Sequence, residues 1–501
     1  MIIDSHVHFP AGWDGRSGAG RQLVRSAMPY GIGACVVSHL FGRNMANLHF
    51  PDSASVRAAN RFAAEQSALN PGRLFFMGYI NPQNPDWMTE FDSCLRQGAC
   101  GIKLWVSLKD PSGSLENTVK VLRRAASAGK AVYLHVFNRT GGNLPGEIDM
   151  AEFIELAQTV PECRMIAGHT GGNWRRSAEI VKHCPENVWM ETGGSNPDFG
   201  MVDGILKFCP PERLLYGSDG LGRAFFPQIW KIRESSLSSA DQDRVLHRNA
   251  LELLNLPEPP EPDVPPAVPQ PAPGPEKIDY CCFCGHYPYE KRPDHSPEQL
   301  EKLLEEEGIE AAYTADFGAI FGGASNRDFL ERCRGLHRVK PLAAVDPADP
   351  EYDALLEETA ADPAWQGIWL SPAFHRWKLD DPAYTTFLRR CAEVGKPVFI
   401  NCEFYEPRFY HPDLHIRPVA DGELRSFLAR SPFELCIIQG KIPLAGAGDP
   451  RHCLWCYTRL SDGSAMSSVM AGADVPKLVR GSEFPFRHLH ETLAATQFRM
   501  P

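Results

Sequence analysis

Two histidines near the start of the chain are the first residues whose spacing suggests chemistry. They lie in the segment IDSHVHF, residues 3–9, which is apolar enough to form a short buried strand. Residues two apart point to the same side of a strand, so the side chains of His6 and His8 face the same way. Two imidazoles placed like this can share one metal ion, although ordinary polar residues at a strand end would give the same pattern.

The elements that would hold these residues alternate regularly through the first half of the chain. Short apolar runs typical of strands are separated by amphipathic segments typical of helices, and a helix over 241–254 ends the series. With the opening segment there are eight predicted strands, the others being 34–40, 74–80, 101–106, 131–137, 164–169, 188–191 and 214–218. Eight alternating strands and helices predict a closed (β/α)8 barrel with parallel strands.

Polar residues of the types that bind metals occur at or near the carboxyl ends of these strands. They are His6, His8, Lys103, His135, His169 and Asp219. Each alone could be a capping residue or a polar residue at the edge of the core. Active sites of such barrels lie at the carboxyl ends of the strands, so their presence together predicts a metal site there. Nitrogen and oxygen ligands without thiolates suit zinc, manganese or iron(II).

The composition argues against several other classes of protein. The chain of 501 residues has a net charge of −11 and no basic run, which argues against a nucleic-acid partner. No apolar run is long enough to cross a membrane, and the first strand begins too early for a signal peptide, so we expect a cytoplasmic protein. Fifteen scattered cysteines indicate reduced, buried thiols. The alternative is a zinc site built from the C-x-x-C pairs Cys281/Cys284 and Cys453/Cys456.

Six motifs of the first half resemble a known family. They are IDSHVHF, GIKLW, YLHVF, AGHTGG, YGSDG and HRNALELLNL, and they occur in the order of the predicted strands. Together they resemble the amidohydrolase superfamily, and within it the amidohydrolase-related branch, over residues 1–256. That branch includes hydrolases, lactonases and non-oxidative decarboxylases. The resemblance therefore implies a metal-dependent barrel enzyme that acts on a small molecule.

The resemblance also implies roles for residues at the carboxyl ends of the strands. His6, His8, His135 and Asp219 would bind one divalent metal ion rather than two, with zinc expected first and manganese or iron as alternatives. His169 and Asp219 would be the catalytic residues. His169 would lie beside the metal-bound water or the substrate oxygen, as a second ligand or as an acid–base and electrophilic group, and Asp219 would carry the proton.

Three cationic residues are expected to contact the substrate. Lys103 occupies the strand where some relatives carry a carboxylated lysine between two metal ions, and a direct contact with the substrate is the reading that we prefer. Arg139 and Arg223 lie in loops that follow predicted strands, where an arginine could bind a substrate carboxylate. A solvated surface arginine remains the alternative for each of the two.

Three functions fit this set of residues. We expect first a hydrolase of an amide, lactone or ester bond, in which a metal-activated water attacks and Asp219 carries the proton. The second is a non-oxidative decarboxylase of an aromatic or unsaturated carboxylate, in which protonation at carbon replaces the attack by water. The third, from a different class, is a non-catalytic scaffold or binding protein with a relic site.

The second half of the chain repeats the first after a proline-rich linker, residues 257–276. IDYCCFC matches IDSHVHF, GIWLSP matches GIKLW, and KLVRGSEFP matches RLLYGSDGL, in the same order. Residues 277–501 therefore predict a second barrel of the same origin, so the expected fold is two tandem TIM-type barrels.

The second barrel is expected to be degenerate at its site. The positions of His6, His8, Lys103 and His135 are taken by Cys281, Phe283, Trp369 and Asn401, and only Asp219 keeps a carboxylate, as Glu483. We therefore expect no metal chemistry there. Members of this branch commonly form dimers, as the resemblance implies, so we expect the two barrels to form an intramolecular pseudo-dimer.

Overall fold

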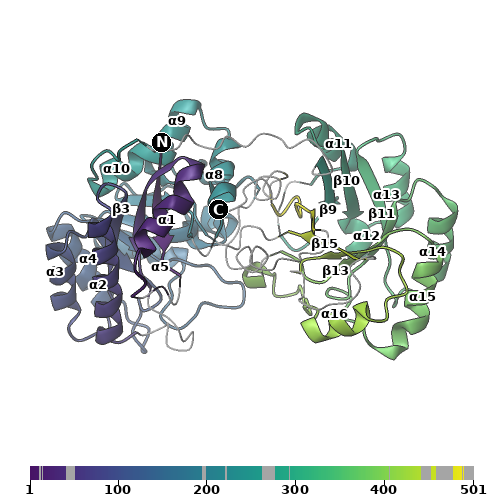
Figure 1. Ribbon diagram of the computed structural model, residues 1–501, viewed down its shortest axis with the longest axis horizontal. Coiled ribbons are helices and arrows are strands. Elements are labelled where there is room, and N and C mark those ends of the chain that lie inside the picture. Colours follow the sequence, from purple (N-terminus) through teal and green to yellow (C-terminus); the bar gives the residue numbers. More distant parts are fainter. Residues whose placement is uncertain are drawn as a thin grey trace. The chain divides into compact units, whose positions relative to one another are not determined.

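The structure is a computed structural model of the chain. It describes residues 1–10, 13, 15–40, 51–194, 199–220, 223–261, 277–290, 292, 294–405, 407–441, 453–458, 478–487 and 489. The described residues form two compact units, one up to residue 261 and one from residue 277 onward, and each is considered by itself (Figure 1). No helix among the described residues is long and apolar enough to span a bilayer.

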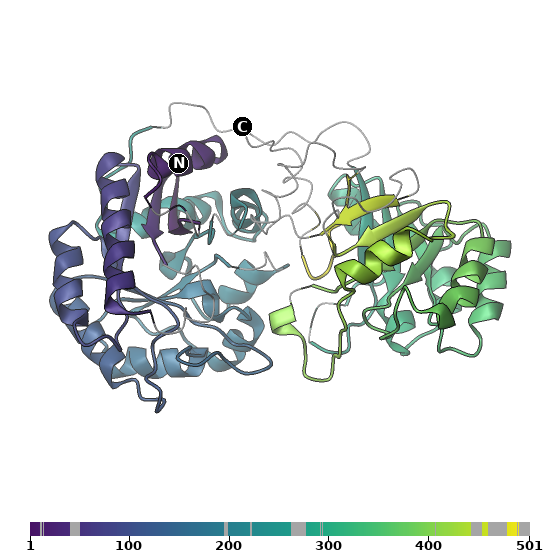
Figure 2. The ribbon, with the colours of Figure 1, turned by 60° about the horizontal axis from the view of Figure 1, so that its bottom comes forward.

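The first unit is a barrel of eight parallel strands that pair in chain order, with helices around the outside (Figures 1 and 2). The strands are β1 (Ile2–His8), β2 (Ile32–Ser38), β3 (Leu74–Tyr79), β4 (Gly101–Leu104), β5 (Val132–Leu134), β6 (Met165–Ala167), β7 (Val188–Glu191) and β8 (Leu214–Leu215). Hydrogen bonds between β1 and the residues around β8, such as Ser5 N to Tyr216 O at 3.1 Å, close the barrel. The predicted (β/α)8 fold is confirmed.

Side chains at the helix starts hold several of the surrounding helices. Asp52 accepts a hydrogen bond from Ser55 N at 2.7 Å, and Asp149 forms a reciprocal cap with Glu152.

The predicted last helix, 241–254, is split by a π-helical turn. The helices are α1 (Ala19–Ala27), α2 (Ser53–Leu69), α3 (Trp87–Arg96), α4 (Glu116–Ser127), α5 (Met150–Thr159), α6 (Trp174–Ile180), α7 (Met201–Ile205), α8 (Phe225–Arg233), α9 (Ser239–Asp243) and α10 (Asn249–Leu254).

The second unit is also an eight-stranded parallel sheet in chain order, and its helices cover the strands in the same way. Its strands are β9 (Ile278–Cys284), β10 (Ala311–Asp316), β11 (Val339–Ala344), β12 (Gly367–Leu370), β13 (Val398–Asn401), β14 (Cys436–Gln439), β15 (Cys453–Tyr457) and β16 (Leu478–Arg480). Its helices are α11 (Pro297–Glu306), α12 (Phe317–Phe321), α13 (Asn326–Cys333), α14 (Tyr352–Ala361), α15 (Thr385–Glu393) and α16 (Asp421–Leu428). The predicted tandem barrels are therefore present.

Both barrels close on a buried aspartate in their first strand. Oδ1 of Asp4 accepts a hydrogen bond from Ser218 N at 2.9 Å, and Oδ1 of Asp279 accepts one from Ser482 N at 3.0 Å. Each aspartate also accepts a hydrogen bond from the backbone N–H two residues further along its own strand. The same side chain thus joins the first and last strands in both units, which supports their common origin.

The backbone after the last strand is strained in the same way in both barrels. Asp219 has φ 59° and Glu483 has φ 56°, the left-handed region that side chains other than glycine rarely adopt. The second barrel keeps this conformation at the position where the first has its expected ligand. Such strain is often found at functional sites, where the surrounding structure holds it.

Aromatic side chains fill the second barrel at the positions of the lost ligands. Phe283 and Trp369 are each 1% exposed, and their ring centroids lie 6.1 Å apart. Phe404 and Phe486 pack against Phe283 with centroids 6.0 and 6.1 Å away. Where the first barrel gathers imidazoles, the second therefore has an apolar core.

The cysteines are free and buried, as expected for reduced thiols. The thiol of Cys281 contacts that of Cys456, and Cys284 lies 3.6 Å from a carboxylate oxygen of Asp316. Cys453 lies beside Cys436 instead. The four residues of the two C-x-x-C pairs therefore do not converge on one zinc site.

Candidate metal centre

The residues expected to do chemistry lie at one end of the first barrel. All eight strands run parallel, so their carboxyl ends meet at the same rim. His6 and His8 lie at the end of β1, Lys103 lies in β4, and His135, His169 and Asp219 follow β5, β6 and β8.

The first group of side chains consists of His6, His8 and Asp219. Nε2 of His6 lies 2.8 Å from Nε2 of His8, and Oδ1 of Asp219 lies 3.7 Å from the first and 3.6 Å from the second. One ligand atom of each residue lies within 4.8 Å of the other two. A single ion can therefore be reached by all three with little movement.

His135, the fourth expected ligand, lies beside His169 and outside that group. Nδ1 of His135 is 3.2 Å from Nε2 of His169. The ring of His169 in turn lies 5.1 Å, between centroids, from the ring of His6. The site thus contains two adjacent pairs of histidines, His6/His8 and His135/His169.

Two buried residues belong to the site although the sequence did not single them out. Glu191 ends β7 and forms a second possible ligand group with His6 and His169. Tyr133 lies in β5, and its hydroxyl is 2.8 Å from Nδ1 of His6. A signal existed for Glu191, because a carboxylate ending an apolar strand is unusual. Tyrosine is common in strands, so Tyr133 gave no such signal.

Hydrogen bonds to the outer ring nitrogens fix the tautomers of His8 and His169. Nδ1 of His8 lies 2.8 Å from the carbonyl oxygen of Ser38, and Nδ1 of His169 lies 3.2 Å from that of Gly193. A carbonyl oxygen can only accept, so both Nδ1 atoms carry the hydrogen. The Nε2 atoms, which face the neighbouring histidines, therefore keep their lone pairs.

Glu147 fixes His135 in the same manner. Nε2 of His135 donates to Oε1 of Glu147 at 2.9 Å, which leaves the lone pair on Nδ1, facing His169. Arg139 donates to the same carboxylate at 2.8 Å and lies 4.7 Å above the ring of Phe137. The guanidinium expected to bind substrate is therefore engaged with a carboxylate of its own barrel.

Lys103 reveals the tautomer of His6. Its Nζ lies 3.2 Å from Nε2 of His6 and 3.5 Å above the centre of the Tyr133 ring. When Lys103 is an ammonium group it can only donate, so Nε2 of His6 then accepts and carries the lone pair. The ammonium also lies over the electron-rich face of the Tyr133 ring, which attracts a positive charge.

Burial keeps the histidines neutral. It lowers the pKa of His6 and His169 well below the usual value, and nearby Lys103 and histidine charges act in the same direction. Burial and Lys103 likewise lower the pKa of His8 to about 4. The pKa of His135 is also lowered by burial, although Glu147 opposes the change. All four are thus imidazoles at neutral pH, the form that binds metals.

The charged groups of the site behave differently. Burial by itself raises the pKa of Asp219, but His6, His8 and Arg223 outweigh it, so the pKa of Asp219 is lowered. Asp219 is therefore an ionised carboxylate near the charge of Arg223. Burial lowers the pKa of Lys103 to about 7.

The donor set fits a divalent metal ion. Lone pairs face each other between Nε2 of His6 and Nε2 of His8, 2.8 Å apart, and between His135 and His169, 3.2 Å apart. Facing lone pairs repel, and a cation bound between such groups replaces the repulsion by attraction. Neutral imidazoles with one ionised carboxylate are ligands that zinc, manganese and iron(II) accept.

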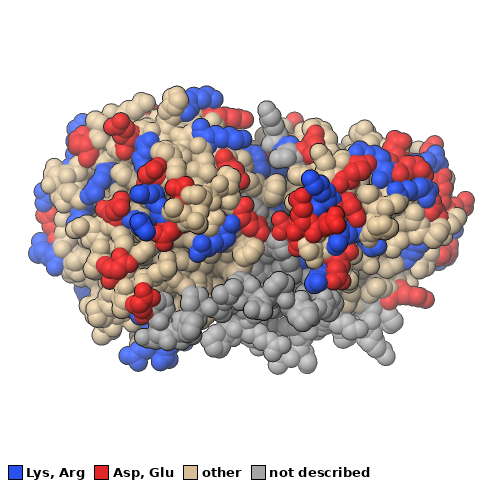
Figure 3. All heavy atoms as spheres, turned by 90° about the horizontal axis from the view of Figure 1, so that it is seen from above, with Lys and Arg blue, Asp and Glu red and all other residues tan. Residues whose placement is uncertain are grey.

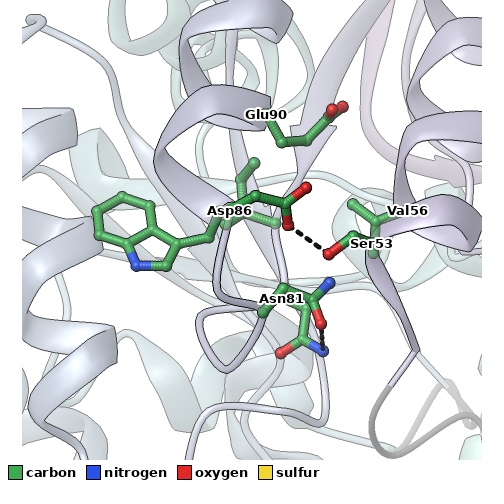
Figure 4. Close-up of a pocket in the computed structure, with 8 residues that line it drawn as sticks. Ser53, Val56, Asn81, Asp86 and Glu90 are labelled. Atoms are coloured by element: carbon green, nitrogen blue, oxygen red, sulfur yellow. Dashed lines mark hydrogen bonds between the residues drawn. The ribbon is translucent and has the colours of Figure 1, made fainter.

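A shallow surface pocket lies elsewhere in the first barrel, after β3 and between the starts of α2 and α3 (Figure 4). Asp86 accepts hydrogen bonds there from Ser53 and Arg57, and Oε1 of Glu90 accepts one from Asn60 at 2.7 Å. Its carboxylates are thus engaged by neighbouring side chains. The residues that line it are Ser53, Val56, Ile80, Asn81, Asn84, Asp86, Trp87 and Glu90.

The fold and the histidine cluster define a (β/α)8 protein with a candidate metal-binding site at the carboxyl ends of its strands. Residues 3–256 match the model of the Amidohydrolase family, and the chain belongs to this family. No curated protein matches the sequence.

The matching solved structures align with about half of this chain and with nearly all of their own length. One is 2,6-dihydroxybenzoate decarboxylase from Rhizobium, with 17% identity, 51% of this chain and 98% of that chain covered, and a TM-score of 0.40. A dihydroxybenzoic acid decarboxylase from a Polaromonas species, with bound manganese and 2-nitroresorcinol, has 19% identity, coverages of 51% and 97%, and a TM-score of 0.41. 4-Oxalomesaconate hydratase from Rhodopseudomonas palustris has 15% identity, coverages of 51% and 96%, and a TM-score of 0.38.

Proposed function

We propose that the first barrel, residues 1–256, is the catalytic unit and holds one divalent metal ion. Its ligands would be His6, His8, His135 and Asp219, with zinc the first candidate and manganese or iron(II) the alternatives. The observation that carries this proposal is the inward direction of the histidine lone pairs. Membership of the Amidohydrolase family supports it.

The charges of the site support a carboxylate as substrate. Lys103 and Arg223 act on Asp219 as nearby positive charges. With a divalent ion added, positive charge outweighs the carboxylates of Asp219 and Glu191, so the site favours an anion. Lys103 and Arg223 are the residues that we propose for binding it. Arg139 stays a candidate that would first have to leave Glu147.

The reaction that we propose first is non-oxidative decarboxylation of an aromatic or unsaturated carboxylate, which the sequence alone placed second. The bond to the carboxylate breaks, carbon dioxide leaves, and the carbon keeps the electron pair and takes up one proton. A bound metal would supply positive charge to substrate oxygens that become more negative. Asp219 and His169, whose Nε2 faces the site, are the groups of the chain that can relay the proton: each would first take one up from the substrate or from water and then pass it to carbon.

Hydrolysis of an amide, lactone or ester is the second candidate. It is favoured by the ionised carboxylate of Asp219 within 3.7 Å of the facing nitrogens of His6 and His8. A carboxylate placed there can take a proton from an attacking water and pass it to the leaving group.

A substrate panel separates the two reactions. The full chain is loaded with zinc, manganese or iron(II) in turn and given 2,6-dihydroxybenzoate, other aromatic carboxylates, lactones, esters and amides. We expect carbon dioxide from a carboxylate, and loss of this activity in a His6→Ala/His8→Ala variant. Acid release from a lactone or ester without carbon dioxide would establish hydrolysis instead. Metal-loaded protein without turnover on any compound would favour the non-catalytic scaffold.

Three further expectations stay predictions. The second barrel, residues 277–501, is proposed to have no metal-dependent activity, because its corresponding positions hold Phe283 and Trp369. The two barrels are proposed to form an intramolecular pseudo-dimer. The protein is proposed to be cytoplasmic.

A further inference from the structure

The carboxylate of Glu191 accepts several hydrogen bonds beside the histidine cluster. It is fully buried, and its Oε2 accepts from the Tyr133 hydroxyl at 2.7 Å and from His169 N at 2.9 Å. Its Oε1 accepts from Gly193 N. Oε2 therefore has both of its acceptor positions taken by donors of the protein, so a metal ion could bind that oxygen only by displacing one of them, and Oε1 is engaged by one donor.

Tyr133 connects this carboxylate to His6. Its hydroxyl donates to Glu191, so its oxygen is left to accept. Nδ1 of His6 lies 2.8 Å from that oxygen and must carry the hydrogen that is donated. Nε2 of His6 then has the lone pair, in agreement with the hydrogen bond that it accepts from Lys103 at 3.2 Å.

The same carboxylate supports the backbone of His169. His169 has φ 59°, a left-handed conformation that is strained for a histidine, and its N–H points at Oε2 of Glu191. Glu191 is thus linked to His6 through Tyr133 and to the backbone of His169 directly, in both cases by hydrogen bonds that its own oxygens accept.

We propose that Glu191 is a positioning residue and not a metal ligand: through Tyr133 it fixes the tautomer of His6, and through the His169 N–H it holds His169 at the site. This inference rests on the metal site proposed above. Groups that orient a ligating histidine typically change metal affinity by about 10–100-fold when removed.

The test compares metal affinity in Tyr133→Phe and Glu191→Gln with that of the unmodified full chain. Metal-depleted protein is titrated with cobalt(II) or zinc against a chromophoric chelator, and the visible spectrum of the cobalt form reports the number of ligands. Tyr133→Phe keeps the ring under Lys103 and removes only the hydroxyl. Tyr79→Phe is the matched control, because the Tyr79 hydroxyl is buried and has no hydrogen-bond partner among the described residues.

We expect Tyr133→Phe to weaken binding about tenfold or more, with the intensity of the cobalt spectrum unchanged, and Tyr79→Phe to bind normally. The double variant Tyr133→Phe/Glu191→Gln should lose less than the sum of the two single losses, because both act through His6. Thermal unfolding identifies variants that fail to fold, and Tyr133→Phe decides the question if Glu191→Gln is one of them.

Two results would overturn the inference in distinguishable ways. If the unmodified chain binds metal and Tyr133→Phe binds equally tightly, Glu191 does not act through Tyr133, and loss of one ligand from the cobalt spectrum of Glu191→Gln would make it a direct ligand. If the unmodified chain binds neither cobalt nor zinc, the proposed metal site fails and the positioning role fails with it.

Discussion

Each histidine of the site has its two ring nitrogens committed to different tasks. The outer nitrogen donates to a fixed acceptor, which is Ser38 O for His8, Gly193 O for His169 and Glu147 for His135. The inner nitrogen keeps a lone pair that faces another imidazole. Because the acceptors come from different segments of the barrel, the donor set exists only when the whole barrel is folded.

Glu147 offers a first test at this scale. Glu147→Ala would leave His135 free to change tautomer and Arg139 without its carboxylate, so we expect metal affinity to fall by about 10–100-fold. Stability should fall as well, because a buried ion pair loses one partner. Metal titration and thermal unfolding measure the two effects. Glu155→Ala, an exposed position on α5, is the control, and equal affinity in both variants would exclude the role of Glu147.

Asp219→Asn tests the proton transfer. The amide keeps the size of the side chain but cannot take up a proton as the carboxylate does, so we expect turnover to fall by about 10²–10⁴-fold. The Michaelis constant should change much less, because the lost interaction belongs to the transition state. Metal content measured on the same sample separates this loss from loss of the ion. Near-normal turnover with metal bound would contradict the assignment.

At the scale of elements, the parallel strands place the site and a buried aspartate closes each barrel. Asp4 and Asp279 each accept a hydrogen bond from the backbone of the segment that follows the last strand of their barrel, in the same geometry. The strand that carries His6 and His8 is therefore held by an aspartate contact that the second barrel also has, although the second barrel lacks these histidines. This contact belongs to the scaffold and not to the metal site.

Asp279 can be altered without touching the proposed catalytic unit. Asp279→Ala leaves the N–H groups of Cys281 and Ser482 without their buried acceptor, which costs about 2 kcal/mol or more of unfolding free energy. Asp279→Asn keeps an acceptor oxygen and removes a carboxylate whose pKa burial raises, so it should be far milder. Denaturant unfolding measures both, and equal stability of the two variants would show that the hydrogen bonds do not matter.

The elements of the fold could be predicted from sequence more completely than the contacts of the site. Strand-like apolar runs at regular spacing are enough to predict eight strands and the rim residues that follow them. Tyr133 has no such signal, because its role depends on which neighbour its hydroxyl meets. Glu147 lies in a loop beyond β5, and no spacing rule connects it to His135 or shows that it would engage Arg139.

At the scale of the whole molecule, two barrels of one origin differ in what occupies their rims. In the second, Glu483 pairs with Arg487 at 3.1 Å, and both side chains are 1% exposed. Its carboxylate is thus tied to a cation of the protein, at the position where Asp219 faces histidines. On the face drawn in Figure 3, acidic and basic side chains of the described residues lie intermixed. On the second unit, exposed ion pairs such as Arg332 with Glu298 join neighbouring helices. Such pairs each add little to stability.

These differences predict that only one barrel takes up metal. Glu483→Gln should leave the metal content of the chain unchanged, because the described part of the second barrel has no histidines at the corresponding positions. Elemental analysis of this variant beside the unmodified chain measures it. A fall in metal content would mean that the second barrel also binds an ion.

The most direct measurement of the central claim is the metal content of the full chain purified without chelator, beside that of the His6→Ala/His8→Ala variant. We predict about one divalent ion per chain, as for a single site with histidine and carboxylate ligands, and a value close to zero in the variant. Unfolding of both proteins by heat confirms that the variant is folded. An unchanged metal content in the folded variant would contradict the assignment of the metal centre to this rim.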